Sequence, residues 1–225
     1  MSDVQVPPEP GALRLVGTLT VAGFLAGLLL AATYELTLPT ITANAQAALR
    51  AAVFQVVPGT TSMRKLVLAG ERFVVADGSE DKNATVAYAA YGEGGALLGF
   101  ALPADGPGFQ DTIKLIYGYD PSRAHIVGMQ VLESRETPGL GDKIFKDPKF
   151  AAEFDDLACT PEIKVVKHGT GSAPHEVDGI TGATISSKSV VRILNEQNRR
   201  LLDKLPARDA LPPAPTEPAQ KEDSK

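Results

Sequence analysis

The chain has 225 residues and a mass of 23.7 kDa, which allows one medium-sized domain with additional segments. Its 22 Lys and Arg against 27 Asp and Glu give a formal net charge of -5, the wrong sign for gripping a nucleic acid backbone. A single cysteine, Cys159, excludes an intrachain disulfide and an iron-sulfur cluster ligated by cysteines of this chain. We expect Cys159 to be a small buried apolar residue.

The first regional feature is an uncharged stretch over residues 15–34, bracketed by Arg14 and Glu35. A helix of 20 residues spans about 30 Å, the thickness of a bilayer core. The stretch predicts a transmembrane helix, with residues 1–14 as an N-terminal cytoplasmic segment. A cleaved signal peptide is the alternative, although its apolar region usually has only about 7 to 15 residues.

The orientation of this helix depends on Arg14, because the next basic residue is Arg50. The positive-inside rule therefore favours a cytoplasmic N-terminus and places residues 35–205 outside, as an extracytoplasmic domain. We therefore expect a single-pass protein of the bacterial inner membrane whose domain lies on the periplasmic side.

The rest of the chain predicts an α+β domain with a mostly antiparallel sheet and flanking helices. A helix is expected over 39–57, where Pro58 and Gly59 end it, and others over 147–154 and 185–205. Short turns join the expected strands. These strands are 63–68, 71–75, 85–91, 97–102, 112–119 and 126–134. The Pro-rich residues 206–225 are expected to be a disordered tail.

Residues 178–187, DGITGATISS, directly precede the most amphipathic segment of the chain. Thr181, Thr184 and Ser186 place three hydroxyls around a Gly-Ala turn at a helix start, where backbone N–H groups and the helix dipole favour an anion such as phosphate. From the residues alone, one of these threonines can equally be a simple N-cap.

The string from Asp178 to Thr184 resembles the D-x-x-[ST]-G-A-T signature of covalent FMN-binding domains at every fixed position. In that family a flavin transferase esterifies the final threonine with the phosphate of FMN, and FAD is the donor. The resemblance implies that Thr184 carries covalent FMN. It further implies that the rest of the motif contacts the cofactor or the transferase; these residues are Asp178, Gly179, Thr181, Gly182 and Ala183.

A second string, ETPGLG, follows the last long expected strand and is by itself an ordinary Pro-Gly turn. It resembles the loop that this family places against the flavin. The resemblance implies further cofactor-binding residues, namely Glu136, Thr137, Pro138, Gly139, Leu140 and Gly141. Upstream, Gly108-Phe109-Gln110 also resembles the family's approach to a central strand.

One N-terminal anchor followed by a single FMN domain resembles the G subunits of Rnf ion-translocating ferredoxin:NAD electron-transport complexes, over nearly the whole chain. The resemblance implies an electron-relay subunit without independent turnover. Its partners would be other membrane and redox subunits and, during maturation, a flavin transferase. The C subunit of the sodium-translocating NADH:quinone reductase has the same plan and stays an alternative.

The residues alone do not exclude two other functions: a membrane-tethered module that binds a noncovalent phosphate ligand, and a free-standing flavin reductase. A metal site is not expected, because His125, His168 and His175 are scattered along the chain. No common hydrolase motif occurs, so no catalytic acid-base residue is expected.

Overall fold

The computed structural model describes residues 11–79, 81 and 84–214. Within them the chain forms two compact units, residues 1–47 and residues 48–225, and each is described by itself. Helix α1, Ala12–Val56, belongs to both, since its last turns are part of the second unit.

In the first unit α1 is apolar and exposed, and by length and composition it could cross a membrane. The sequence predicts two separate helices here, over 15–34 and 39–57, but the structure has one. Pro39 lies inside α1, so the backbone hydrogen bond that a proline removes does not end the helix here.

The second unit is built on a seven-stranded antiparallel sheet in the order β2-β1-β3-β4-β5-β6-β7. Its strands are β1 Ser62–Ala69, β2 Arg72–Val75, β3 Val86–Tyr91, β4 Leu97–Pro107, β5 Thr112–Asp120, β6 His125–Glu133 and β7 Leu157–Ala158. A separate parallel pair joins β8, Lys164–Val166, to β9, Glu176–Asp178. The expected α+β class and antiparallel sheet are confirmed.

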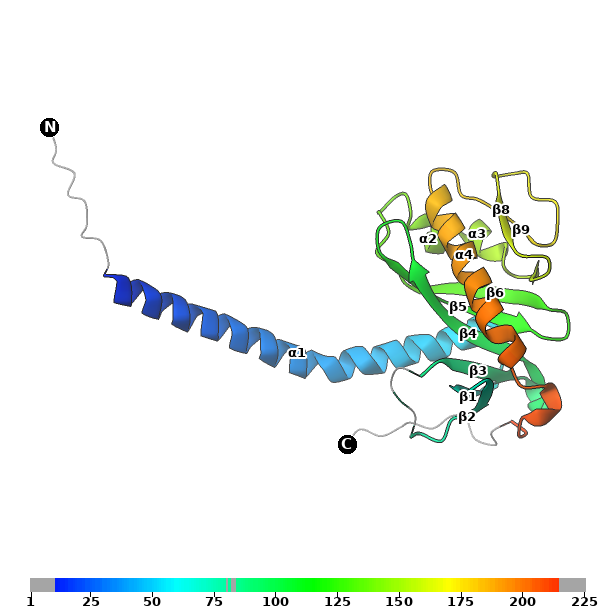
Figure 1. Ribbon diagram of the computed structural model, residues 1–225, viewed down its shortest axis with the longest axis horizontal. Coiled ribbons are helices and arrows are strands. Elements are labelled where there is room, and N and C mark those ends of the chain that lie inside the picture. Colours follow the sequence, from blue (N-terminus) through cyan, green and yellow to red (C-terminus); the bar gives the residue numbers. More distant parts are fainter. Residues whose placement is uncertain (1–10, 80, 82–83, 215–225) are drawn as a thin grey trace. The chain divides into compact units, whose positions relative to one another are not determined.

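Helix α4, Thr184–Leu201, covers one face of the sheet and lies across β4 to β6 (Figure 1). Alternate strand residues and the apolar stripe of α4 form the main core. This core includes Leu66, Phe100, Leu102, Leu115, Val190, Ile193 and Leu194.

Three amide side chains also fix α4 to the elements around it. Asn195 accepts from the Ile163 N–H at 3.2 Å and donates to the Ile163 carbonyl at 2.8 Å. Gln197 donates to the carbonyl of Pro103 at 2.6 Å. Asn198 accepts from the Tyr117 hydroxyl at 2.7 Å.

The other face of the sheet holds the last turns of α1, with Ala52, Val53 and Val56 buried. Two glycines permit this approach: a Cβ at Gly118 or at Gly128 would collide with the Val56 carbonyl oxygen. The sheet therefore has apolar layers on both faces.

The smaller elements are the helices α2, Lys143–Lys146, and α3, Pro148–Ala152, and three short 3-10 turns. The turns are η1 Glu93–Gly95, η2 Leu202–Lys204 and η3 Arg208–Ala210. Helix α3 corresponds to the expected helix over 147–154, and α4 with η2 to the one over 185–205.

The segment 206–214 differs from the expected disordered tail. Leu211 and Ala214 pack against the main core, and Arg208 donates to the Leu97 carbonyl at 2.6 Å. Carbonyls of the same segment accept from Arg64 at 2.8 Å and from the Tyr91 hydroxyl at 3.3 Å. Residues 215–225 lie outside the described residues.

Candidate functional site

An apolar hollow of the domain lies where three segments meet: the β4–β5 turn, the loop after β6 and the start of α4. Its volume is about 340 Å³. The side chains of Phe109, Leu140 and Ile185 stand around it and are 63%, 51% and 58% exposed. Large apolar side chains left this exposed beside a hollow are typical of a ligand or partner site. We call this site the apolar hollow. Its other lining residues are Thr137, Gly141, Gly182, Ala183, Thr184 and Ser186.

Thr184 is exposed in the apolar hollow as the first residue of α4. Its hydroxyl makes only a long contact of 3.4 Å, to the Ile180 carbonyl. The first turn of any helix has N–H groups without acceptors inside the helix, together with the positive end of the helix dipole. The chain therefore places an accessible hydroxyl at an electropositive helix start.

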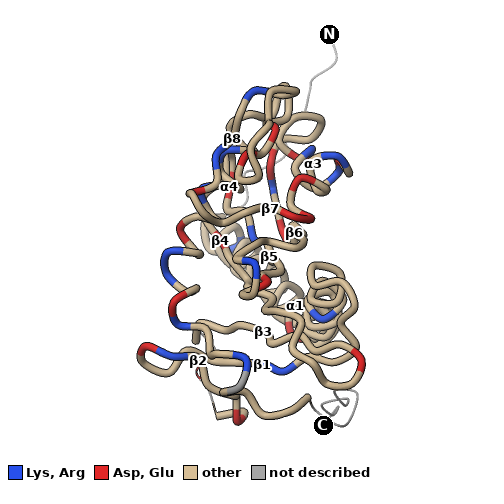
Figure 2. Tube along the Cα trace, turned by 90° about the vertical axis from the view of Figure 1, so that its right-hand side faces the viewer, with Lys and Arg blue, Asp and Glu red and all other residues tan. Residues whose placement is uncertain are grey.

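A second hollow, of about 390 Å³, shares Thr184 with the first. It also holds Thr181 and three groups that can carry positive charge, Lys167, His168 and Lys188. Lys188 follows Thr184 by four residues, so both are on the same side of α4. We call this site the basic hollow, and Figure 2 shows Lys and Arg segments in blue beside β8.

Glu136 lies behind the wall of the apolar hollow and is only 4% exposed. Its Oε1 accepts from the backbone N–H groups of Phe109 at 2.8 Å and Gln110 at 3.0 Å, and its Oε2 from the Ser186 hydroxyl at 2.5 Å. One carboxylate thus joins all three segments. Burial raises the pKa of Glu136, but the hydrogen bonds from Ser186, Gln110 and Phe109 outweigh it and hold the pKa below its usual value.

Two neighbours of Glu136 complete this connection. Thr137 donates its hydroxyl to the Gln110 side chain at 2.8 Å. Gly141 leaves space for it, because a Cβ there would lie 2.6 Å from Glu136 Oε2 and 2.8 Å from Ser186 Oγ.

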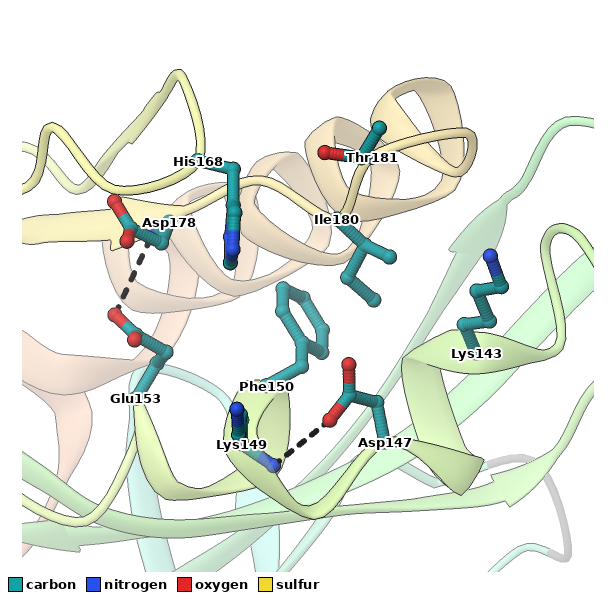
Figure 3. Close-up of a pocket in the computed structure, with 9 residues that line it drawn as sticks. All are labelled: Lys143, Asp147, Lys149, Phe150, Glu153, His168, Asp178, Ile180 and Thr181. Carbon is teal, nitrogen blue, oxygen red and sulfur yellow. Dashed lines mark hydrogen bonds between the residues drawn. The ribbon is translucent and has the colours of Figure 1, made fainter.

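Asp178 lies away from the apolar hollow. Its carboxylate accepts from the N–H groups of Gly169 at 2.7 Å and Gly171 at 2.9 Å, and both bonds lower its pKa. Asp178 lines a third hollow together with Lys143, Lys149 and Glu153, which we call the charged hollow. Figure 3 shows Asp178 beside Glu153, with Thr181 across the same hollow. Asp178 therefore shapes the loop after β8.

The structure brings most of the sequence-predicted residues to these hollows. Gly182 and Ala183 line the apolar hollow, and Gly179 and Thr181 the basic one. Pro138 and Gly139 line neither hollow. Gly139 has a φ of +78° and forms the turn before Leu140. The expected list omits Phe109, Ile185, Ser186 and Lys188. The sequence offers one indication for Ile185, because it is an apolar residue between the hydroxyl residues Thr184 and Ser186.

Among the described residues, no group of three or more His, Cys, Asp or Glu side chains could hold a metal ion. Cys159 is partly buried, which raises the pKa of its thiol to about 11. It therefore stays a thiol at neutral pH and is not a reactive residue.

Comparison with known proteins identifies this arrangement. Residues 108–197, which contain all three segments, match the family model of the FMN-binding domain. The G subunit of an ion-translocating oxidoreductase complex from Methanosarcina acetivorans is 32% identical over 186 residues, 81% of this chain and 90% of that protein. The chain belongs to the family of these G subunits. The G subunit of the proton-translocating ferredoxin:NAD(+) oxidoreductase complex from Clostridium ljungdahlii is 30% identical over 79% of this chain and 85% of its own length.

The fold of this member of the family is also similar to a solved structure. The crystal structure of the C subunit of the Na(+)-translocating NADH-quinone reductase from Parabacteroides distasonis superposes with a TM-score of 0.50 and 25% identity. The match covers 62% of this chain and 74% of that one. The resemblance that the motifs indicate is confirmed at the level of the family and the domain.

The chemistry of the residues in this G subunit is suited to FMN. The apolar hollow suits a flat aromatic ring, and its volume lies in the usual range of ligand sites, about 300–1,000 Å³. Thr184 and the helix start suit a phosphate. Gly141 keeps the wall between them free of a side chain that would push it apart.

Proposed function

We propose that this protein is the membrane-anchored electron-transfer subunit of an ion-translocating oxidoreductase complex and carries FMN covalently on Thr184. The family of G subunits and the FMN-binding domain support the role of an FMN-containing electron carrier. FMN, when bound, can take up or release one or two electrons, so the protein has to hold and tune it.

One observation supports Thr184 as the attachment residue. Thr184 lines both the apolar and the basic hollow, whereas Thr181 lines only the basic and the charged ones. Lys188 would therefore be the cation on the same side of α4 as a phosphoester on Thr184, and Phe109, Leu140 and Ile185 would hold the ring. In the attachment step a bond forms between Thr184 Oγ1 and the FMN phosphorus of FAD, the pyrophosphate bond breaks, and AMP leaves with the proton.

The chain's own residues have three tasks in this proposal. Phe109, Leu140 and Ile185 bind the ring and exclude water from part of it. Lys188 and the first turn of α4 balance the charge of the phosphodiester. The partners are the other membrane and redox subunits of the complex and the flavin transferase, with the domain on the extracytoplasmic side.

The test is the intact mass of the full chain produced together with a flavin transferase and FAD. The unaltered protein and Thr181→Ser should both gain one FMN, and Thr184→Val should gain none. Thr181→Ser is the control because either hydroxyl residue fits the signature at this exposed position of the same turn. Covalent flavin on Thr184→Val would refute the assignment, and unlabelled wild-type protein would refute covalent attachment altogether.

A further inference from the structure

We propose that the buried carboxylate of Glu136 acts as a fixed negative charge behind the flavin hollow and lowers the reduction potential of the bound flavin. This inference rests on the proposed function, because it requires FMN in the apolar hollow. It makes Glu136 a positioning residue with an electrostatic effect, and it does not require contact between Glu136 and the flavin.

The carboxylate is held entirely by neutral donors. Two backbone N–H groups and one hydroxyl bind it, at 2.8, 3.0 and 2.5 Å. The ion pairs of the part of the chain that the structure describes do not include Glu136. Asp142, buried to a similar degree six residues later, differs in this respect, since Lys146 pairs with it at 2.6 Å. Among the described residues, the buried charge of Glu136 therefore has no cation paired with it, unlike that of Asp142.

The location of this charge gives it an effect in the hollow. Two of its donors belong to residues that line the apolar hollow, Phe109 and Ser186. Screening by water is weak because the carboxylate is buried. Its pKa lies below the usual value, so it is ionised at neutral pH.

An added electron gives the flavin one more negative charge when no proton accompanies it. A fixed negative charge nearby opposes this step and so lowers the potential. Two unit charges on the order of 10 Å apart, in an effective dielectric constant of about 20, change such an equilibrium about tenfold. For a one-electron step a tenfold change corresponds to about 59 mV.

Glutamine can separate the charge from the hydrogen bonds. In Glu136→Gln the amide oxygen can accept from Phe109 and Gln110, while the amide nitrogen donates to Ser186 Oγ. The shape of the wall is kept and only the charge is removed. Glu133→Gln is the matched control, because it removes the same charge from an exposed position at the end of β6 that pairs with Lys114.

The experiment is a spectroelectrochemical titration of the flavin-loaded full chain in detergent. Glu136→Gln should raise the midpoint potential of a one-electron step by about 59 mV, a tenfold change in the equilibrium. Glu133→Gln should leave it at the wild-type value. Ser186→Ala keeps the charge and removes a donor that disperses it, so its potential should stay equal or fall.

Each result decides the question. Equal potentials in the wild type and Glu136→Gln, both loaded with FMN, overturn this inference and leave the proposed function intact. A rise in Ser186→Ala also overturns it, because loop geometry would then set the potential, and this result can be obtained even if Glu136→Gln fails to fold. Wild-type protein without any flavin overturns the inference together with the proposed function.

Discussion

Substituting Gly141 by alanine tests whether the connection around Glu136 organises the flavin site. A Cβ at Gly141 would lie 2.6 Å from Glu136 Oε2, 2.8 Å from Glu136 Cβ and 2.8 Å from Ser186 Oγ. All three neighbours belong to the contact between the loop after β6 and the start of α4. The added methyl group must therefore push these two segments apart or break the hydrogen bond between Glu136 and Ser186.

The expected cost follows from this crowding. Insertion of a methyl group into a filled site typically costs about 1–3 kcal/mol. For a domain of this size each kcal/mol lowers Tm by about 2–4 °C. Because Thr184 and Leu140 lie on the two segments that move, Gly141→Ala should also reduce the yield of covalent FMN.

Gly139→Ala is the matched control in the same loop. A Cβ there meets nothing within 4 Å, but φ is +78°, so alanine costs about 1–2 kcal/mol through backbone strain alone. This variant should lose stability and keep its FMN yield. The measurements are thermal unfolding and intact mass of the full chain in detergent.

A double-mutant cycle with Ser186→Ala decides between the two causes. In Gly141→Ala the second substitution removes one colliding atom, so the combined loss of stability should fall short of the sum by more than about 0.5 kcal/mol. With Gly139→Ala the effects should add. Additive effects for Gly141→Ala, or an unchanged FMN yield, would refute the reasoning.

Three further predictions concern the rest of the molecule. Truncation after Leu205 should lower Tm relative to truncation after Ala214, because only the latter keeps the hydrogen bonds of Arg64, Tyr91 and Arg208; equal Tm values would mean that segment 206–214 adds no stability. Glu136 has a lowered pKa in the fold, so its stabilising effect is complete above the unfolded value of about 4.3 and is lost as pH falls through the folded value. Unfolding midpoints between pH 7 and pH 3 should therefore fall less steeply for Glu136→Gln than for the wild type. A periplasm-specific reporter fused after Val57 should be active, and activity of a cytoplasmic reporter alone would refute the proposed topology.

The long elements of the fold can be predicted because their patterns are strong. Six strands and α4 appear where alternation and the helical period place them. The strands β7, β8 and β9 have only two or three residues each, too few to show a period. The prolines of segment 206–214 predict disorder, but its order depends on distant carbonyl acceptors and donors that no local pattern reveals.

From the sequence, the site can be predicted only as two sequence motifs. The family resemblance points to ETPGLG and DGITGAT, and part of each motif lines the apolar hollow with Thr184, namely Thr137, Leu140, Gly141, Gly182 and Ala183. The sequence could not show that Glu136 turns inward, because its three donors come from residues 26 to 50 positions away. Phe109 and Lys188 belong to the site through the same long-range folding.

The amide contacts of α4 have a consequence for how the protein exchanges electrons. A shift of this helix by one residue is an axial movement of about 1.5 Å, and it would break the bonds of Asn195, Gln197 and Asn198 together. These bonds therefore resist axial sliding of the helix that begins at Thr184. Under the proposed attachment at Thr184, the flavin would be joined to a helix that is fixed at three points, so the helix would add little structural rearrangement to electron exchange within the domain.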